Sequence, residues 1–320
     1  MSASPDCILQ ADADDFSVAK AAEILEDTGY VILRGLFSKS KIENALQRIR
    51  EVSAKPAIAG TSGYIKVDHP KKFIEPFLSG PEFYGLTLNE TVLDVIEERM
   101  NGECVLAEGL IKVDEPTDYT YFDMHTDFSV GWKKSPDSPT SLSAEDMKKP
   151  IGIGCIVYFH DTASGAFRYC AGSHKLAAPH GQDLARYPED EKQAILATNT
   201  RLDGKAGDVV LFDDRGFHGP DQPSTAQRTV LLLDFYSVDV FGFVQVSPVP
   251  VLTSYLNGLN DRQKRVLGLG SGFMVPPDER HTNRFRSNAL FPLIDRMIGM
   301  AYLKPHLKNR IKRIIRPEQG

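Results

Sequence analysis

The stretch GDVVLFDDRGFHGP, residues 207–220, has a form that recurs through the middle of the chain. A short run of β-branched and aromatic residues leads into a tight polar turn, and a histidine follows the turn. A run of this kind is typical of a buried strand bounded by turn residues. We therefore expect His218 to lie at the rim of a sheet, directly after the strand.

Similar apolar runs, separated by turn residues, occupy the chain from about 103 to 247 and include CVLAEGLIKV (104–113), IGIGCIVYFH (151–160) and RTVLLLDFYSV (228–238). Repeated short strands of this kind indicate a β-sandwich or a jelly-roll barrel. Helical spacing of apolar residues dominates on both sides of this region.

The whole chain is therefore expected to be mainly β with flanking helices. We predict one domain over 1–247, with N-terminal helices in 14–102 and the barrel core at about 103–247. Residues 248–320 would form a helical C-terminal extension packed on the same domain.

Composition limits the classes of partner. The chain has 320 residues, 42% hydrophobic and 25% charged, and a net charge of −6, as in globular proteins without a general attraction to nucleic acid. It has no apolar run of the roughly eighteen residues that a membrane helix needs. The acidic start MSASPDCILQ lacks the features of a signal peptide, so we expect a cytoplasmic protein that acts on a small molecule. The oligomeric state cannot be read from the sequence.

The stretch YFDMHTDFS, residues 121–129, places a histidine and an aspartate two positions apart among apolar residues. On a strand, side chains at i and i+2 point to the same face. His125 and Asp127 would then be presented together. Taken alone, they are more consistent with a buried hydrogen-bonded pair than with half of a metal site.

His218 and Arg228 favour the metal site. Two histidines and one carboxylate form the facial triad of non-haem iron(II) oxygenases, which leaves metal positions open for a co-substrate and O₂. A 2-oxoglutarate co-substrate also needs a cation for its far carboxylate. Arg228 opens an apolar strand, where its planar guanidinium could bind that carboxylate, although an arginine taken alone is more often part of a surface ion pair.

The sequence resembles the phytanoyl-CoA dioxygenase (PhyH) family of Fe(II)/2-oxoglutarate-dependent oxygenases over roughly residues 15–240. The motifs that carry the resemblance are EILEDTGYVILRGLFSKSKI (23–42), MHTDF (124–128), SGAFRYCAGSHK (164–175), GDVVLFDDRGFHG (207–219) and QRTVLLLDFY (227–236). The sequence departs from the family pattern in two places: Ala171 replaces a usual proline, and Pro220 and Asp221 follow the His-Gly pair where small and amide residues are usual.

The resemblance implies a double-stranded β-helix (jelly-roll, cupin-like) fold in which His125, Asp127 and His218 bind iron(II). Arg228 would bind 2-oxoglutarate, and Lys112 would contact co-substrate or substrate. The implied reaction is hydroxylation of an unactivated C–H bond of a small natural-product-like or lipid-like molecule, consuming 2-oxoglutarate and O₂ and releasing succinate and CO₂. Desaturation and ring formation use the same triad.

Two other functions remain open at this stage. The same His/Asp/His ligands could bind zinc in a hydrolase, which would leave Arg228 without a necessary role. A barrel that binds a ligand or partner without turnover is the other alternative.

The C-terminal segment AYLKPHLKNRIKRIIRPEQG, residues 301–320, combines basic residues with apolar ones at helical spacing. Such a helix can lie on an anionic membrane surface. We favour the alternative, in which its apolar stripe packs on the barrel.

Overall fold

The computed structural model describes residues 2–53, 65–68, 71–120, 122–133, 141–162, 165–241, 251 and 255–268. Strands and short helices alternate along this part of the chain. Its strands are β1 Ile8–Gln10, β2 Tyr30–Arg34, β3 Ile65–Asp68, β4 Lys71–Ile74, β5 Cys104–Asp114, β6 Gly152–Tyr158, β7 Phe167–Cys170, β8 Asn199–Leu202, β9 Val209–Asp213, β10 His218–Pro220 and β11 Arg228–Ser237. Its helices are α1 Val18–Thr28, α2 Lys39–Ser53, α3 Pro76–Ser79, α4 Glu82–Thr87, α5 Glu90–Met100, α6 Glu189–Ala197, α7 Val238–Phe241 and α8 Asp261–Val266.

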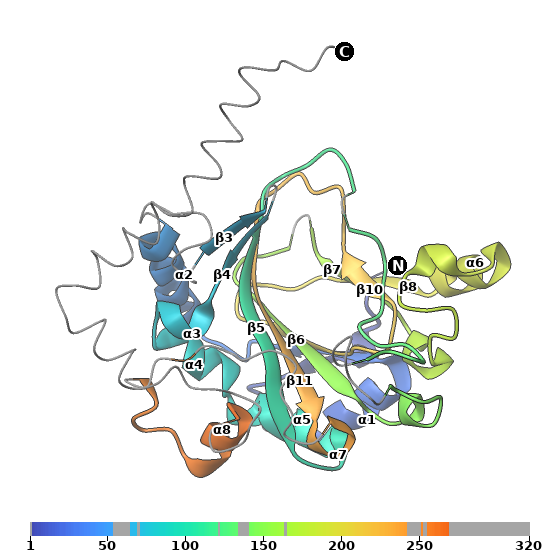
Figure 1. Ribbon diagram of the computed structural model, residues 1–320. Coiled ribbons are helices and arrows are strands. Elements are labelled where there is room, and N and C mark those ends of the chain that lie inside the picture. The colour runs from blue at the N-terminus through green and yellow to red at the C-terminus, as the bar shows by residue number, and fades with distance from the viewer. Residues whose placement is uncertain are drawn as a thin grey trace, which may run out of the picture.

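The strands form two sheets. The larger has the order β1-β2-β9-β6-β11-β5-β4-β3, and the smaller has the order β10-β7-β8. Within the larger sheet every described pairing is antiparallel except β1 with β2. Figure 1 shows β7, β8 and β10 opposite the long strands β5 and β11. This is the mainly β, jelly-roll arrangement expected from the recurring apolar runs.

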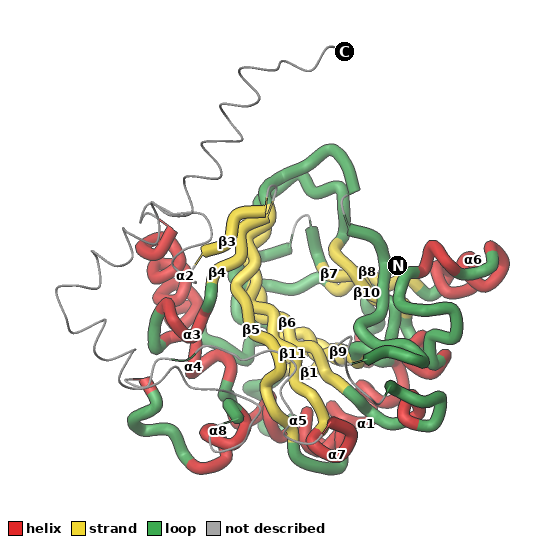
Figure 2. The backbone as a smooth tube through the Cα atoms, viewed as in Figure 1, coloured by secondary structure: helices red, strands yellow, loops and turns green. Residues whose placement is uncertain are grey.

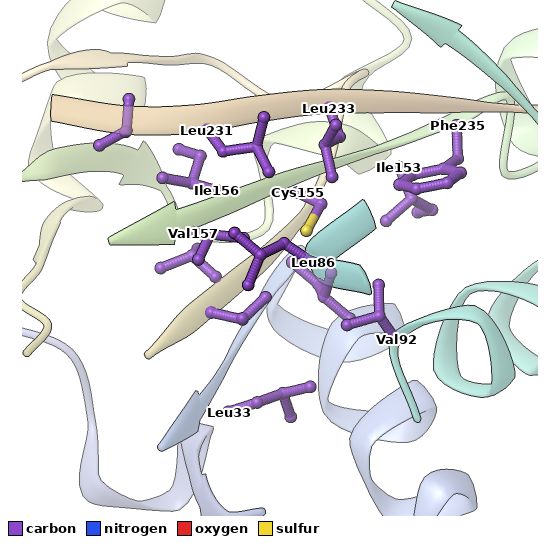
Figure 3. Packing of buried hydrophobic residues seen from close by; sticks show 14 of the residues in the cluster. Leu33, Leu86, Val92, Ile153, Cys155, Ile156, Val157, Leu231, Leu233 and Phe235 are labelled. Atoms are coloured by element: carbon purple, nitrogen blue, oxygen red, sulfur yellow. The ribbon is translucent and has the colours of Figure 1, made fainter. Parts of the chain in front are cut away.

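Helices cover the outer face of the larger sheet, as the tube in Figure 2 shows for α2 to α5. Alternate residues of β11 and β6 point outward into this layer, among them Leu231, Leu233 and Cys155, which are buried. They belong to one hydrophobic core with residues of α4 and α5, and Figure 3 shows Leu86 and Val92 in it. Burial of this apolar surface is the main stabilising contribution to the fold.

Local signals fix the ends of the helices. The Ser17 hydroxyl accepts a hydrogen bond from the amide of Lys20 at the start of α1, as an N-cap does. Helix α1 ends at Gly29, whose φ of 86° lies in the left-handed region. A side chain at Gly29 would also collide with the rings of Tyr169 and His174, so glycine is needed there for two reasons.

Some expectations differ from the structure or lie outside it. Residues 122–129 do not form a strand: His125 makes only isolated bridges, to His218 and Asp183. Of the C-terminal extension, the described residues hold helix α8, whose Val266 is buried in the main core. The basic segment 301–320 lies outside the described residues. No helix in the described part of the chain is long and apolar enough to cross a membrane.

Candidate metal centre and co-substrate pocket

Two backbone segments bring the predicted ligands together. His125 and Asp127 lie in the loop before 130, and His218 is the first residue of β10. The amide of His125 donates to the carbonyl of His218 at 3.0 Å, and the amide of His218 donates back at 2.8 Å. The amide of Asp127 donates to the carbonyl of Asp214 at 2.9 Å. Main-chain hydrogen bonds therefore hold the loop against the strand, as a full strand would.

The three side chains converge on one point. His218 Nε2 lies 3.3 Å from Asp127 Oδ2, and His125 Nε2 lies 3.7 Å from Asp127 Oδ1. One ligand atom from each residue lies within 4.8 Å of the ligand atoms of the other two. This spacing allows a single ion to contact all three side chains.

Both histidines have the tautomer that a metal ligand needs. His125 Nδ1 lies 3.1 Å from the carbonyl oxygen of Asp123, and His218 Nδ1 lies 2.9 Å from that of Gly216. A carbonyl oxygen can only accept, so each Nδ1 carries the proton and donates it. The lone pair of each ring is consequently on Nε2, which faces Asp127.

Burial keeps the imidazole of His125 neutral. Burial first, and then the neighbouring His218, lower the pKa of His125 to about 4. Burial alone would raise the pKa of Asp127, but His218 and His125 lower it overall, so Asp127 is ionised. Two imidazole nitrogens and one carboxylate are the donor set of the facial triad, so these residues fit iron(II).

Aromatic rings surround the centre. Phe122 packs edge-on against His125, with ring centroids 4.6 Å apart. Phe167 and Phe212 lie 5.5 and 4.8 Å from the ring of His218. These rings and the three ligands line a cavity of about 240 Å³ between the two sheets. Apolar rings therefore flank both histidine ligands, although Phe122 itself is 40% exposed.

Both predicted co-substrate residues line the same cavity. Arg228 is buried, and its Nε and Nη2 donate to Asp114 Oδ2 at 3.0 and 2.6 Å while Nη1 donates to the carbonyl of Gly165 at 3.2 Å. A guanidinium has five N–H donors, so two remain for an incoming carboxylate. Arg228 is thus held in place by Asp114 rather than paired at the surface.

Lys112 lies beside this pair. Its Nζ is 3.5 Å from Asp114 Oδ1, and its side chain is 9% exposed. Burial, followed by the charge of Arg228, lowers the pKa of Lys112 to about 8. The two cations outnumber the one carboxylate between them, so this end of the cavity attracts anions.

Three acidic residues of the site, Asp114, Glu108 and Asp234, were not predicted from the sequence. Glu108 and Asp234 line the cavity. The sequence does contain a signal for them, because alternate residues of a strand lie on the same face. In AEGLIKVD the residues Glu108, Lys112 and Asp114 share one face of the strand, and Asp234 stands six positions after Arg228.

Comparison with known proteins agrees with this geometry. A profile of the phytanoyl-CoA dioxygenase (PhyH) family matches residues 25–230, which is more than half of the chain. The chain belongs to the phytanoyl-CoA dioxygenase family. The PhyH enzymes are Fe(II)/2-oxoglutarate-dependent oxygenases, so iron(II), 2-oxoglutarate and O₂ are the cofactors of this family. No curated protein matched the chain.

Solved structures of the same fold include EctD from S. alaskensis with 2-oxoglutarate and 5-hydroxyectoine, at 18% identity and a TM-score of 0.54 over 73% of this chain and 81% of that one. HygX from Streptomyces hygroscopicus with nickel, 2-oxoglutarate and hygromycin B has 16% identity and a TM-score of 0.50 over 81% and 97%. The carbocyclase SnoK has 18% identity and a TM-score of 0.52 over 72% and 87%. At these identities the likeness establishes the double-stranded β-helix fold of the PhyH chain.

Proposed function

We propose that this PhyH protein is a dioxygenase that hydroxylates an unactivated C–H bond of a small organic molecule. One atom of O₂ would enter the substrate as hydroxyl, and the other would enter succinate as 2-oxoglutarate loses CO₂. The observation that carries the proposal is the convergence of His125, Asp127 and His218 in a cavity that also contains Arg228.

The chain's own residues have distinct roles in this proposal. His125, Asp127 and His218 would hold iron(II) on one face, and the iron with its co-substrates would supply the oxidant for the C–H bond. Arg228 would bind the distal carboxylate of 2-oxoglutarate through its two remaining donors, while Asp114 orients the guanidinium. Lys112 would add a second positive charge near that carboxylate.

Aromatic side chains complete the proposed site by excluding water. Phe122, Phe167 and Phe212 contact the imidazole rings of the ligands. A dry cavity strengthens electrostatic contacts within it and protects reactive species from hydrolysis or side reactions. A zinc hydrolase would have the opposite requirement, because water is its substrate, and it would leave Arg228 and Lys112 without a role.

The binding test is anaerobic titration of iron(II) and 2-oxoglutarate into metal-free protein, followed through the visible metal-to-ligand charge-transfer band. The wild-type protein should give the band, and His218→Ala should not. Arg228→Lys keeps the positive charge but loses the paired N–H donors of the guanidinium. This variant should need about ten- to a hundredfold more 2-oxoglutarate to give the same band. Absence of the band in folded wild-type protein with excess iron would overturn the proposal.

The reaction type is tested separately, with ¹⁸O₂ and mass spectrometry of the oxidised substrate. Hydroxylation predicts the gain of one labelled oxygen atom. Loss of two hydrogens without gain of oxygen would indicate desaturation or ring formation instead, while leaving the assignment of the metal and co-substrate intact.

A further inference from the structure

The end of the cavity farther from Arg228 is acidic. Glu108 on β5 and Asp234 on β11 are directly opposite each other in the antiparallel register, and both line the cavity. Arg228 lies six residues before Asp234 on β11, which places their Cα atoms about 20 Å apart along the strand. Cationic and anionic side chains therefore occupy opposite ends of one cavity.

Both carboxylates belong to a row that crosses the inner face of the larger sheet. Phe212, Gly154, Asp234 and Glu108 are in register across β9, β6, β11 and β5. A side chain at position 154 would collide with the ring of Phe212, which covers the glycine. The row thus presents one aromatic ring and two carboxylates to the cavity.

These two carboxylates lack internal compensation. Within the residues that the structure describes, the side-chain carboxylates of Glu108 and Asp234 have no hydrogen-bond or ion-pair partner. The cations at the other end of the cavity, Lys112 and Arg228, both contact Asp114 instead. Carboxylates that line a cavity without a partner are available to a ligand.

Asp214 is a further acid near Asp234, although it does not itself line the cavity. It is 0% exposed, and neither of its carboxyl oxygens has a hydrogen-bond partner among the described residues. The Asp214 carboxyl packs on Gly152, where a Cβ atom would lie only 2.5 Å from Oδ2. Gly152 pairs with Tyr236 of β11. Burial of an ionised carboxyl group without a partner costs free energy, unless the group is protonated or a cation lies close by.

The carboxyl groups near Glu108 and Asp234 repel one another when they are ionised. Burial, and next the charge of Glu108, raise the pKa of Glu75, the residue after β4, to about 7. Neighbouring carboxyl groups disfavour one another's ionised forms, although Glu108 is itself exposed and Asp234 half-buried. A bound cation would relieve the repulsion and allow them to ionise.

We propose that Glu108 and Asp234 bind a positively charged nitrogen of the substrate, so that the substrate class is small molecules that carry an ammonium or guanidinium group. This inference rests on the proposed dioxygenase function and names the substrate class for the same cavity. The carboxylate of 2-oxoglutarate is attracted to the end with Arg228, and the cation of the substrate is attracted to the other. The C–H bond to be oxidised then lies between them, beside the metal ligands.

The test uses simple probes of matched size on the protein loaded with nickel(II) and 2-oxoglutarate. Binding of n-butylammonium is compared with binding of neutral 1-butanol, and binding of n-butylguanidinium with binding of neutral n-butylurea, by calorimetry at low ionic strength. The cations should bind at least about tenfold more tightly, since a hydrogen bond between charged groups is the stronger one. Equal binding would overturn the proposal and indicate neutral carboxyls that bind hydroxyl groups.

Substitutions assign the effect to the two residues. Glu108→Gln and Asp234→Asn keep the shape and remove one charge each, so each should reduce the preference for the cation about tenfold or more. Glu43→Gln on the exposed face of α2 is the matched control and should change nothing. Unchanged cation binding in both cavity variants would overturn the assignment.

The charge-transfer band separates the two proposals. Wild-type protein that lacks the band fails as an iron(II)/2-oxoglutarate enzyme. Wild-type protein that gives the band but shows no preference for the cation fails only the substrate inference. If Asp234→Asn perturbs the band, Glu108→Gln decides, because its side chain projects from a different strand.

Discussion

The two faces of strand β11 differ in what their side chains contact. Its outward residues Leu231, Leu233 and Phe235 are buried against the helices that cover the sheet. Its inward residues include Arg228 and Asp234, which line the cavity. Period-two alternation therefore lets one strand stabilise the fold with one face and bind ligands with the other.

This difference has a thermodynamic consequence. Outward positions are occupied by residues that stabilise the native state, whereas inward positions carry charged groups that are desolvated in part and contribute less to stability. Changes on the two faces should accordingly have separable effects on unfolding and on binding.

The largest expected effect is on the ligand set. His218→Ala should abolish iron(II) binding and 2-oxoglutarate turnover, because two ligands cannot replace the triad. Its thermal stability without metal should stay close to that of wild type. His180→Ala, an exposed histidine paired with Glu191, serves as the control and should retain full activity. Residual metal-dependent turnover in His218→Ala would mean that another residue completes the site.

The next effect compares neighbours on the two faces. Leu233→Ala removes a buried side chain from the outer core and should lower the free energy of unfolding by about 2–5 kcal/mol. Leu232→Ala, on the cavity side, should lower it by less, because Leu232 is only half-buried. Urea unfolding measures both. Equal losses for the two variants would contradict the division of roles between the faces.

Lys112 should show that an inward charge destabilises the empty protein. Its pKa of about 8 lies below the unfolded value of 10.5, so charged Lys112 destabilises the native state fully below pH 8. This cost declines between pH 8 and 10.5, and stability attributable to Lys112 rises over that range. Lys112→Met should therefore be more stable than wild type at pH 7, by about 1–3 kcal/mol.

The control for that variant is Lys39→Met on exposed α2, which should show no such gain. A less stable Lys112→Met at pH 7 would mean that the contact with Asp114 outweighs the cost of burial.

The smallest expected effect is on the pH dependence of co-substrate binding. Above pH 8 Lys112 loses its proton, so the dissociation constant of 2-oxoglutarate should rise, by at most about tenfold per pH unit. The rise should be absent in Lys112→Met, whose affinity is low throughout. Anaerobic titrations of the charge-transfer band from pH 7 to 9 measure it. A flat profile in the wild-type protein would remove Lys112 from the co-substrate site.

Much of the site could be predicted from the sequence because its residues occur in order on recognisable strands. As expected, His218 follows strand β9 and a turn, and Arg228 opens strand β11; that His218 itself begins β10 was not predicted. The segment around His125 was wrongly predicted as a strand, since its apolar composition does not reveal that its hydrogen bonds are with β10 and with the backbone of residues 182 and 214.

Other features depend on pairing between distant strands. Asp114 holds Arg228 only because β5 and β11 are adjacent in this register, and Glu108 meets Asp234 for the same reason. A sequence shows the alternation along each strand but not which strand lies beside it. The acidic end of the cavity was therefore visible only as isolated charges.

The hydrogen bonds at the two Nδ1 atoms have a consequence for how mutations can damage this centre. In each case the acceptor is a carbonyl of the main chain two residues earlier, at Asp123 and Gly216, and not a side chain. No exchange of one amino acid for another deletes a peptide carbonyl, so ring orientation is insulated from most genetic variation. The vulnerable point is Gly216, where a methyl group would strike the Tyr169 hydroxyl and shift the peptide that orients His218.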